Sequence, residues 1–234
     1  MGAVTPIGNT TEEFITALFE GKNGIAPITY FDTSAFKVKL AAELKNFDPL
    51  VYMDKQSVNR TDPFVWYALG AASQASEDSG IVGTLLPDRL GVYFGSGIGG
   101  FGTLCSEHIN LLEKGPRRVS PMFISKMIYN IGAGNIAIRL GAKGPCVAVS
   151  TACATGTTAI GEGYRAIMHG YCDAAVCGGS EASINDFAVA GFAACQTLSN
   201  SADVNEASLP FDARRGGFVM PPYIRRSSPA TCAP

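Results

Sequence analysis

The sequence is poor in the residues that metal centres and many hydrolytic sites require. It contains two histidines, His108 and His169, and its seven cysteines include no CxxC pair and no spacing typical of zinc ligands. We therefore predict neither a metal site nor a bound cofactor. The odd number of cysteines, without a recognisable secretory segment, favours a reducing compartment, so we predict a cytoplasmic protein.

Long apolar runs and an excess of one charge are also missing. No apolar run reaches the roughly 18 residues that a membrane-spanning helix needs, and 18 basic residues nearly balance 20 acidic ones. The basic residues do not gather in a stripe with interleaved aromatic side chains. These absences argue against a membrane span and against a nucleic-acid partner.

The residues that are plentiful are hydrophobic residues, at 47% of the chain, and glycine, which occurs 27 times. A chain of 234 residues with this composition can form one large domain or two small ones around a real core. Patterns typical of strands alternate with helical patterns, which predicts an α/β layered fold. We expect helices after Thr10, over 63–80, 106–112 and 124–140, and from Cys153 to about His169, and strands over 89–96 and 174–177.

The segment from Val147 to Gly161 predicts a buried strand that turns into a helix. Cys153 falls at this turn, about where the helix begins. Free N–H groups and the positive end of the helix dipole would favour its thiolate and stabilise an oxyanion. Cys153 is therefore a candidate nucleophile. The alternative is a buried structural thiol, since free cysteine is among the most buried residue types.

The glycine-rich loop Gly97–Gly100 follows the strand predicted over 89–96. A phosphate-binding site is one interpretation, but the loop lacks the GxGxxG spacing and the lysine of a P-loop. We favour the alternative, in which the glycines let the backbone approach a neighbouring element or a ligand.

A few further polar residues are candidates for a role near the cysteine. His169 lies about sixteen residues after Cys153, or ~24 Å along a continuous helix, so it cannot touch that thiol. His108 is a weak candidate for a base. Glu181 is a candidate acid beside the site, but we favour the alternative of a solvated or ion-paired loop residue. Surface or interface salt bridges are expected for one charged cluster, namely Asp212, Arg214 and Arg215.

Several motifs, in the same order along the chain, resemble those of type II β-ketoacyl-acyl carrier protein synthases. The nucleophile motif is 150–156, and the others are 2–8, 94–100, 178–182 and 210–220. The resemblance covers residues 2 to about 220 and implies a thiolase-like α/β fold. This chain would be approximately the N-terminal half, without the first and the last strand of that half. We therefore expect an incomplete synthase domain over 1–220 and a non-native-looking Pro/Arg tail over 221–234, predicted to be disordered.

The resemblance also implies the chemistry of fatty-acid chain elongation. Cys153 would accept an acyl group from acyl carrier protein, and decarboxylative condensation with malonyl-acyl carrier protein would extend it by two carbons. Ile98, Phe123 and Phe192 match positions that line the family's acyl pocket, and Phe123 would reach the pocket of a second subunit. Ordinary core or interface packing is the alternative for all three. The implied partners are acyl carrier protein and a second copy of the chain, in a homodimer.

The family's two catalytic histidines belong to its second half, so we expect condensation by this chain to be impaired. A non-catalytic dimerisation or acyl-binding module derived from the same family is the alternative. An intact Cys153 argues against the type of module that sets chain length. A cysteine hydrolase or transferase ranks lower, because neither histidine is a good base for Cys153.

Overall fold

The computed structural model describes residues 1–221 and 224–231, and the chain divides into two compact units. The first unit comprises Met1–Val4, Asp48–Ala182 and the described C-terminal segment Ile224–Thr231. The second comprises Thr5–Phe47 and the described residues 183–221. No helix in the described ranges combines the length and apolar character needed to cross a bilayer.

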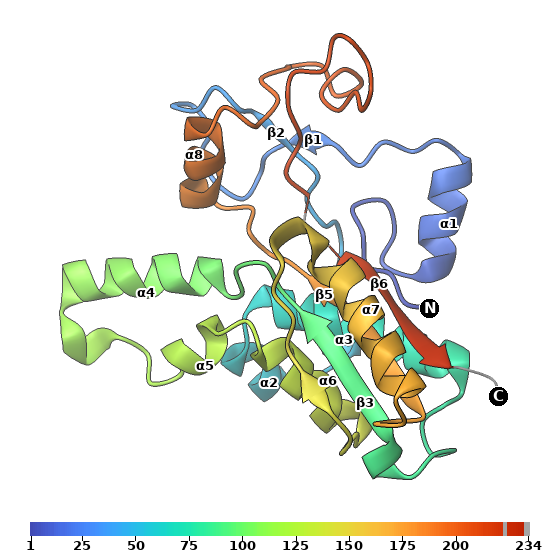
Figure 1. Cartoon of the computed structure of the whole chain (residues 1–234). Coiled ribbons are helices and arrows are strands. Elements are labelled where there is room, and N and C mark those ends of the chain that lie inside the picture. Colours follow the sequence, from blue (N-terminus) through green and yellow to red (C-terminus); the bar gives the residue numbers. More distant parts are fainter. Residues whose placement is uncertain (222–223, 232–234) are drawn as a thin grey trace. The chain divides into compact units, whose positions relative to one another are not determined.

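A four-stranded sheet organises the first unit (Figure 1). Its strands lie in the order β4 (Cys146–Val147), β3 (Leu90–Gly95), β5 (Ala174–Ser180) and β6 (Ile224–Thr231). β3 is parallel to β4 and to β5, whereas β6 is antiparallel to β5. Every residue of β3 and β5 is buried, as expected for parallel strands that are covered on both faces.

Helices cover the two faces of this sheet in a three-layer arrangement. On one face, Val92, Phe94 and Val176 form a buried cluster with residues of α3 (Pro63–Ser79) and α6 (Ile131–Leu140). On the other face, Tyr93 and Cys177 pack with residues of α7 (Thr155–Met168). Consecutive strand residues point to opposite faces, so the alternation along β3 and β5 produces both layers. The predicted α/β fold is confirmed.

Local signals fix the bounds of α3, as the sequence predicts. The side chain of Asp62 accepts a hydrogen bond from the N–H of Phe64 (3.3 Å), and Pro63 occupies the first helical position. Gly80 ends the helix in the left-handed conformation, with φ of 61°. Ten residues of α3 are buried, which makes it the most deeply embedded helix of the described unit.

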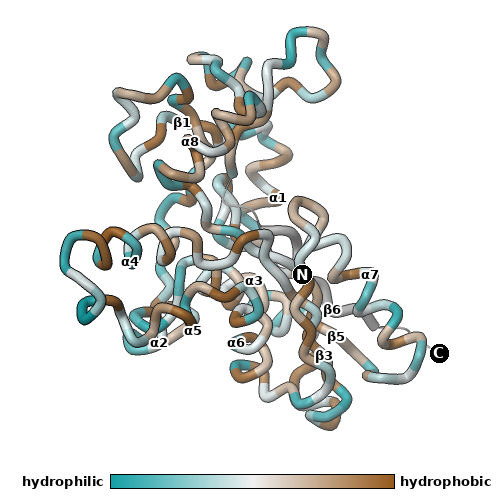
Figure 2. Tube along the Cα trace, turned by 60° about the vertical axis from the view of Figure 1, so that its left-hand side comes forward, coloured by the Kyte–Doolittle hydropathy of each residue, from teal (hydrophilic) through white to brown (hydrophobic). Residues whose placement is uncertain are grey.

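The remaining helices of the first unit are α2 (Lys55–Arg60), α4 (Phe101–Lys114) and α5 (Phe123–Met127). None of the residues of α4 is buried, although Ile109 and Leu112 are apolar. Hydrophobic and hydrophilic segments alternate along α4 in Figure 2.

The second unit contains α1 (Thr11–Phe19), a two-stranded antiparallel ribbon of β1 (Ala26–Pro27) and β2 (Leu40–Ala41), and α8 (Asp186–Ala194). The predicted Thr10 cap begins α1, and Glu13 reaches back to the residue before the cap. Thr10 Oγ1 accepts from Glu13 N (3.1 Å), and Glu13 Oε2 accepts from Asn9 N (2.7 Å). Segments far apart in sequence meet within this unit, since Ala42 N donates to Met220 O (2.9 Å).

Two sequence predictions about local structure are wrong. The single helix expected over 124–140 is divided into α5 and α6, because Met127 O accepts from Gly100 N (2.9 Å) and Ile128 is extended. The buried strand expected from Val147 onward is reduced to β4, whose two residues are exposed. β4 pairs only with β3 among the described strands, so it lies at the edge of the sheet.

The C-terminal segment also differs from its prediction. The tail over 221–234 is expected to be disordered, yet Ile224–Thr231 forms β6 beside β5. Proline cannot donate to a ladder but is tolerated at sheet edges, and β6 is the last strand of the described sheet, with Pro229 opposite Val176. Residues 222–223 and 232–234 lie outside the described ranges.

Candidate active site

Cys153 lies in a short 3-10 turn, Ala152–Ala154, that runs directly into α7. Its side chain is exposed, so the alternative of a buried structural thiol is wrong for this cysteine. Cys177 shows the contrast, because burial raises the pKa of its thiol to about 12 and keeps it protonated at neutral pH. The nucleophilic function of Cys153 stays a prediction, in an environment that fits it.

Backbone strain and hydroxyl groups shape the turn around Cys153. Ala152 has a φ of 48°, in the left-handed region that is unfavourable for residues other than glycine. The hydroxyl of Thr155 accepts from Thr151 N (2.9 Å) and donates to Ala152 O (2.8 Å). Thr151 and Thr158 also share a hydrogen bond between their hydroxyls (2.8 Å). These bonds hold the strained conformation that presents Cys153 ahead of the helix.

The glycine-rich loop after β3 packs against this turn. Ser150 Oγ donates to Gly97 O (3.4 Å), and a Cβ atom on Gly97 would lie 3.8 Å from Ala152 Cα. Two residues before the loop, at the end of β3, a Cβ atom on Gly95 would lie 1.7 Å from Val149 O. Only glycine permits that approach. The prediction that glycines here allow close backbone contact is confirmed.

Glu181 connects the end of β5 to the same loop. One carboxylate oxygen accepts from Ser96 Oγ (3.0 Å), and the other accepts from Gly97 N (2.8 Å) and Ile98 N (3.2 Å). Burial raises the pKa of Glu181, and these hydrogen bonds oppose part of that increase. The expectation of an ion-paired residue is wrong, since no ion pair of Glu181 occurs among the described residues, and the residue is half-buried rather than fully solvated.

The structure brings together some of the residues predicted to bind substrate. Ile98 lies on the loop beside the Cys153 turn, and its side chain is 45% exposed. Phe123 begins α5, whose last residue is bonded to the loop through Met127 O and Gly100 N. Phe192 belongs to the second unit, where its ring packs edge-on against Phe218 with centroids 5.5 Å apart. Substrate contact by all three stays a prediction.

Neither histidine is shown beside the thiol. His169 caps the C-terminal end of the continuous helix α7, whose other end follows Cys153, as the sequence predicts. His108 is an exposed residue of α4. Within the described ranges, no group of three or more His, Cys, Asp or Glu residues is arranged to hold a metal ion. The predicted salt bridge of Arg214 with Asp212 is present at 2.9 Å and lowers the pKa of Asp212.

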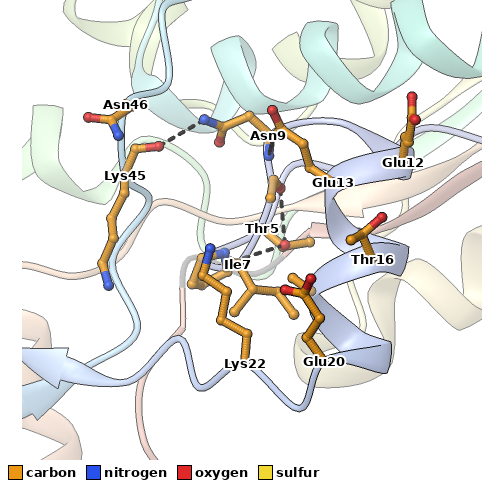
Figure 3. A pocket seen from close by; sticks show the side chains of 13 residues that line it. Thr5, Ile7, Asn9, Glu12, Glu13, Thr16, Glu20, Lys22, Lys45 and Asn46 are labelled. Atoms are coloured by element: carbon orange, nitrogen blue, oxygen red, sulfur yellow. Dashed lines mark hydrogen bonds between the residues drawn. The ribbon is translucent and has the colours of Figure 1, made fainter.

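Two cavities in the described part of the chain are separate from Cys153. The larger, of about 640 Å³, lies in the second unit between α1 and the segment around Lys45 (Figure 3). At its wall, Asn9 Nδ2 donates to Lys45 O (2.8 Å). The other, of about 330 Å³, is lined by residues between Ser199 and Gly216. Cys153 lines neither cavity.

Comparisons with known proteins agree with this architecture. Residues 1–221 match the family model described as beta-ketoacyl synthase, N-terminal domain. The chain is 45% identical over 221 residues to 3-oxoacyl-(acyl-carrier-protein) synthase 2 of Staphylococcus aureus, covering 94% of this chain and 55% of that protein. The protein of the same name from Synechocystis is 45% identical over 222 residues, covering 94% of this chain and 53% of that protein.

Solved structures show the same likeness. The crystal structure of a β-ketoacyl synthase from Burkholderia phymatum matches with a TM-score of 0.80 and 28% identity, over 93% of this chain and 54% of that one. The ishigamide ketosynthase/chain length factor matches with a TM-score of 0.83 and 28% identity, over 93% and 53% respectively. The prediction of a partial thiolase-like fold is confirmed, and the chain spans about half the length of the curated relatives it matches.

Proposed function

Because the chain belongs to the β-ketoacyl synthase family, we propose that it carries the acyl-accepting part of a 3-oxoacyl-acyl carrier protein synthase. The observation that carries this proposal is the exposed Cys153 on a strained turn before α7. The names of its curated relatives support a carrier-bound acyl substrate. We therefore propose acyl carrier protein as a partner, and a second copy of the chain as another.

In the proposed half-reaction, the Cys153 thiolate attacks the carbonyl carbon of an acyl thioester. A tetrahedral oxyanion forms, and in this proposal the N–H of Cys153, in the turn before α7, helps to stabilise it. The carbon–sulfur bond to the carrier then breaks, so the carrier thiol leaves and the acyl group remains on Cys153. The acyl chain would extend past apolar side chains such as Ile98.

The second half-reaction is decarboxylation of a malonyl thioester and attack of the resulting carbanion on the acyl-cysteine. The resemblance assigns its two histidines to the second half of the family's length. His169 lies at the far end of α7 from Cys153. We therefore expect this chain to accept acyl groups readily and to condense them slowly.

Acyl transfer is tested by incubating the chain with octanoyl-acyl carrier protein and measuring its intact mass. We expect one octanoyl group per chain, loss of that group in Cys153→Ala, and retention in Cys195→Ala, which removes another exposed cysteine. Addition of malonyl-acyl carrier protein then measures condensation. Equal acylation of Cys153→Ala would contradict the proposal.

The alternative function is a non-catalytic dimerisation or acyl-binding module. An exposed thiol on a strained turn favours the catalytic hypothesis, because binding alone does not need that thiol. The same experiment separates the two functions. Reversible binding of the acyl group without a covalent mass increase would identify the module.

A further inference from the structure

The polar ends of three neighbouring strands meet beside Cys153. Glu181 follows β5, Ser96 follows β3, and Ser150 lies three residues after β4. Because the three strands are parallel, their carboxyl ends lie at the same edge of the sheet. These side chains form a continuous set of hydrogen bonds across that edge, and the proposed acyl transfer does not use them.

A single carboxylate bonds to three consecutive residues, namely Ser96 and the first two residues of the loop. Glu181 Oε1 accepts from Ser96 Oγ, and Oε2 accepts from Gly97 N and Ile98 N. Ser96 Oγ in turn accepts from Gly99 N (2.9 Å), which extends the same network to the next residue. A Cβ atom on Gly97 would lie 2.8 Å from Glu181 Oε2, so glycine at 97 is what allows the carboxylate to come this close.

The loop in turn contacts the segment that leads into the turn at Cys153. Gly97 O accepts from Ser150 Oγ (3.4 Å), and a Cβ atom on Gly97 would be in ordinary van der Waals contact with Ala152 Cα, at 3.8 Å. Ile98, whose N–H is bonded to Glu181, presents a 45% exposed apolar side chain on the same loop. The position of that side chain relative to the turn therefore depends on the bonds that Glu181 makes.

We propose that Glu181 is a positioning residue, which sets the acyl-chain preference of Cys153 by holding Ile98 in place. This inference rests on the proposed acyl transfer to Cys153. The side-chain hydrogen bonds of Glu181 go to the Ser96 hydroxyl and to backbone N–H groups, and none in the described ranges goes to the thiol of Cys153. Glu181 therefore acts through the loop.

The test reads chain preference without needing a thioester substrate. The chain is labelled with N-ethyl-, N-octyl- and N-dodecylmaleimide, and the rate at each cysteine is measured by peptide mass spectrometry. The dodecyl-to-ethyl rate ratio at Cys153 is divided by the ratio at Cys195, an exposed cysteine outside this network. General loosening of the chain changes both ratios, whereas displacement of Ile98 changes only the first.

Three substitutions are compared with the wild type. Glu181→Leu removes the acceptors at similar volume and is expected to reduce the normalised ratio about fivefold, through lost apolar contact. Glu181→Gln keeps an acceptor oxygen and is expected to stay within about twofold. Glu162→Leu alters an exposed glutamate paired with Arg165 on α7 and is also expected to stay within about twofold.

An unchanged ratio in Glu181→Leu would overturn the inference. If that variant does not fold, Ser96→Ala decides the question by removing one partner of the carboxylate, with an expected decrease of at least about twofold. An unchanged ratio in Ser96→Ala would then overturn the inference as well. A chain that shows the expected ratios but takes no acyl group from a thioester would contradict the proposed function and leave the positioning role of Glu181 intact.

Discussion

Ala152 is the residue at which strain and the candidate chemistry coincide. Its φ of 48° costs an alanine about 1–2 kcal/mol relative to ordinary backbone. The Thr155 hydroxyl offsets part of this by bonding on both sides of the turn. The conformation is thus maintained by contacts formed in the folded chain.

We predict that Ala152→Gly raises the free energy of unfolding by about 0.5–1 kcal/mol, because relief of strain exceeds the added entropy of the unfolded chain. The matched control is Ala154→Gly, two residues later, where φ is −88° and glycine relieves no strain. That variant is expected to lose about 0.5–1 kcal/mol. Urea unfolding measures both, and an equal loss in the two variants would contradict the assignment of strain to Ala152.

Asp62 combines helix capping with burial. It is 2% exposed, caps α3, and accepts from both the N–H (3.2 Å) and the hydroxyl (2.6 Å) of Thr103 on α4. Burial raises the pKa of Asp62, while the bonds from Thr103 and the charge of Lys126 oppose the increase. The folded chain therefore keeps a proton on Asp62 over a pH range in which the unfolded chain has lost it.

This raised pKa predicts how stability depends on pH. Above the ordinary pKa of 3.8, the folded state binds more protons than the unfolded state, so the contribution of Asp62 to stability falls as pH rises through its raised pKa. Asp62→Asn does not titrate, so its Tm minus that of wild type should become more positive from pH 4 to pH 7. Thermal unfolding at a series of pH values measures this difference.

Asp54 provides the matched control, because it caps α2 but is exposed. Hydrogen bonds from Ser57 hold the pKa of Asp54 below its ordinary value. A lowered pKa adds stability above the ordinary value and loses it as pH falls below that value, so the Tm of Asp54→Asn minus that of wild type should become more negative as pH rises from about 2 to about 5. If the Tm differences of the two variants changed with pH in the same direction, burial of Asp62 and hydrogen bonding of Asp54 could not be the causes of their pKa shifts.

At the scale of elements, α7 approaches the sheet through small residues. Its buried positions are Thr155, Gly156, Ala159, Gly163 and Ala166. A Cβ atom on Gly163 would lie 2.2 Å from the Sγ atom of Cys177, a fully buried residue of β5. Gly161, two residues earlier on the same helix, has no atom within 4 Å of such a position.

We predict opposite effects for two alanine substitutions on α7. Gly163→Ala should lower the free energy of unfolding by about 1–3 kcal/mol through overpacking against Cys177. Gly161→Ala should raise it by roughly 0.5–1 kcal/mol through helix propensity alone. In a Cys177→Ala background the Gly163→Ala penalty should largely disappear, which a double-mutant cycle measures. An unchanged penalty in that background would show that Cys177 is not the obstacle.

At the scale of the whole molecule, β6 decides whether β5 is an inner or an edge strand. β5 pairs with β3 on one side and with β6 on the other, and all of its residues are buried. An unpaired strand beside a buried core leaves backbone groups without partners. The contribution of Ile224–Thr231 to stability therefore follows from its place in the sheet, although its composition is not typical of a strand.

A chain that ends at Pro221 tests this contribution. We expect its Tm to fall by about 4–8 °C, corresponding to roughly 2 kcal/mol, with faster hydrogen exchange of the amides in Ala174–Ser180. A chain that ends at Thr231 is the control and should keep the wild-type Tm. Unprotected amides over 224–231 in the full chain, together with no change on truncation, would support the disorder that the sequence predicts.

The sequence by itself determined the elements whose signals lie within a few residues. The Asp62-Pro63 start and Gly80 end of α3, the cap at Thr10, and the start of a helix just after Cys153 are all local. Caps, turns and side-chain periodicity depend on neighbours along the chain, so they can be recognised without knowing what packs against them. The family motifs added the order of these elements and the choice of Cys153.

Only the tertiary structure decided the features that depend on partners far along the chain. Glu181 bonds to Ser96 across 85 positions, and Gly100 ends α5 by bonding to Met127. The edge position of β4 and the pairing of β6 likewise depend on which strands become neighbours. The physical reason is that a hydrogen bond between distant segments forms only after packing has placed both groups, and no local pattern encodes that placement.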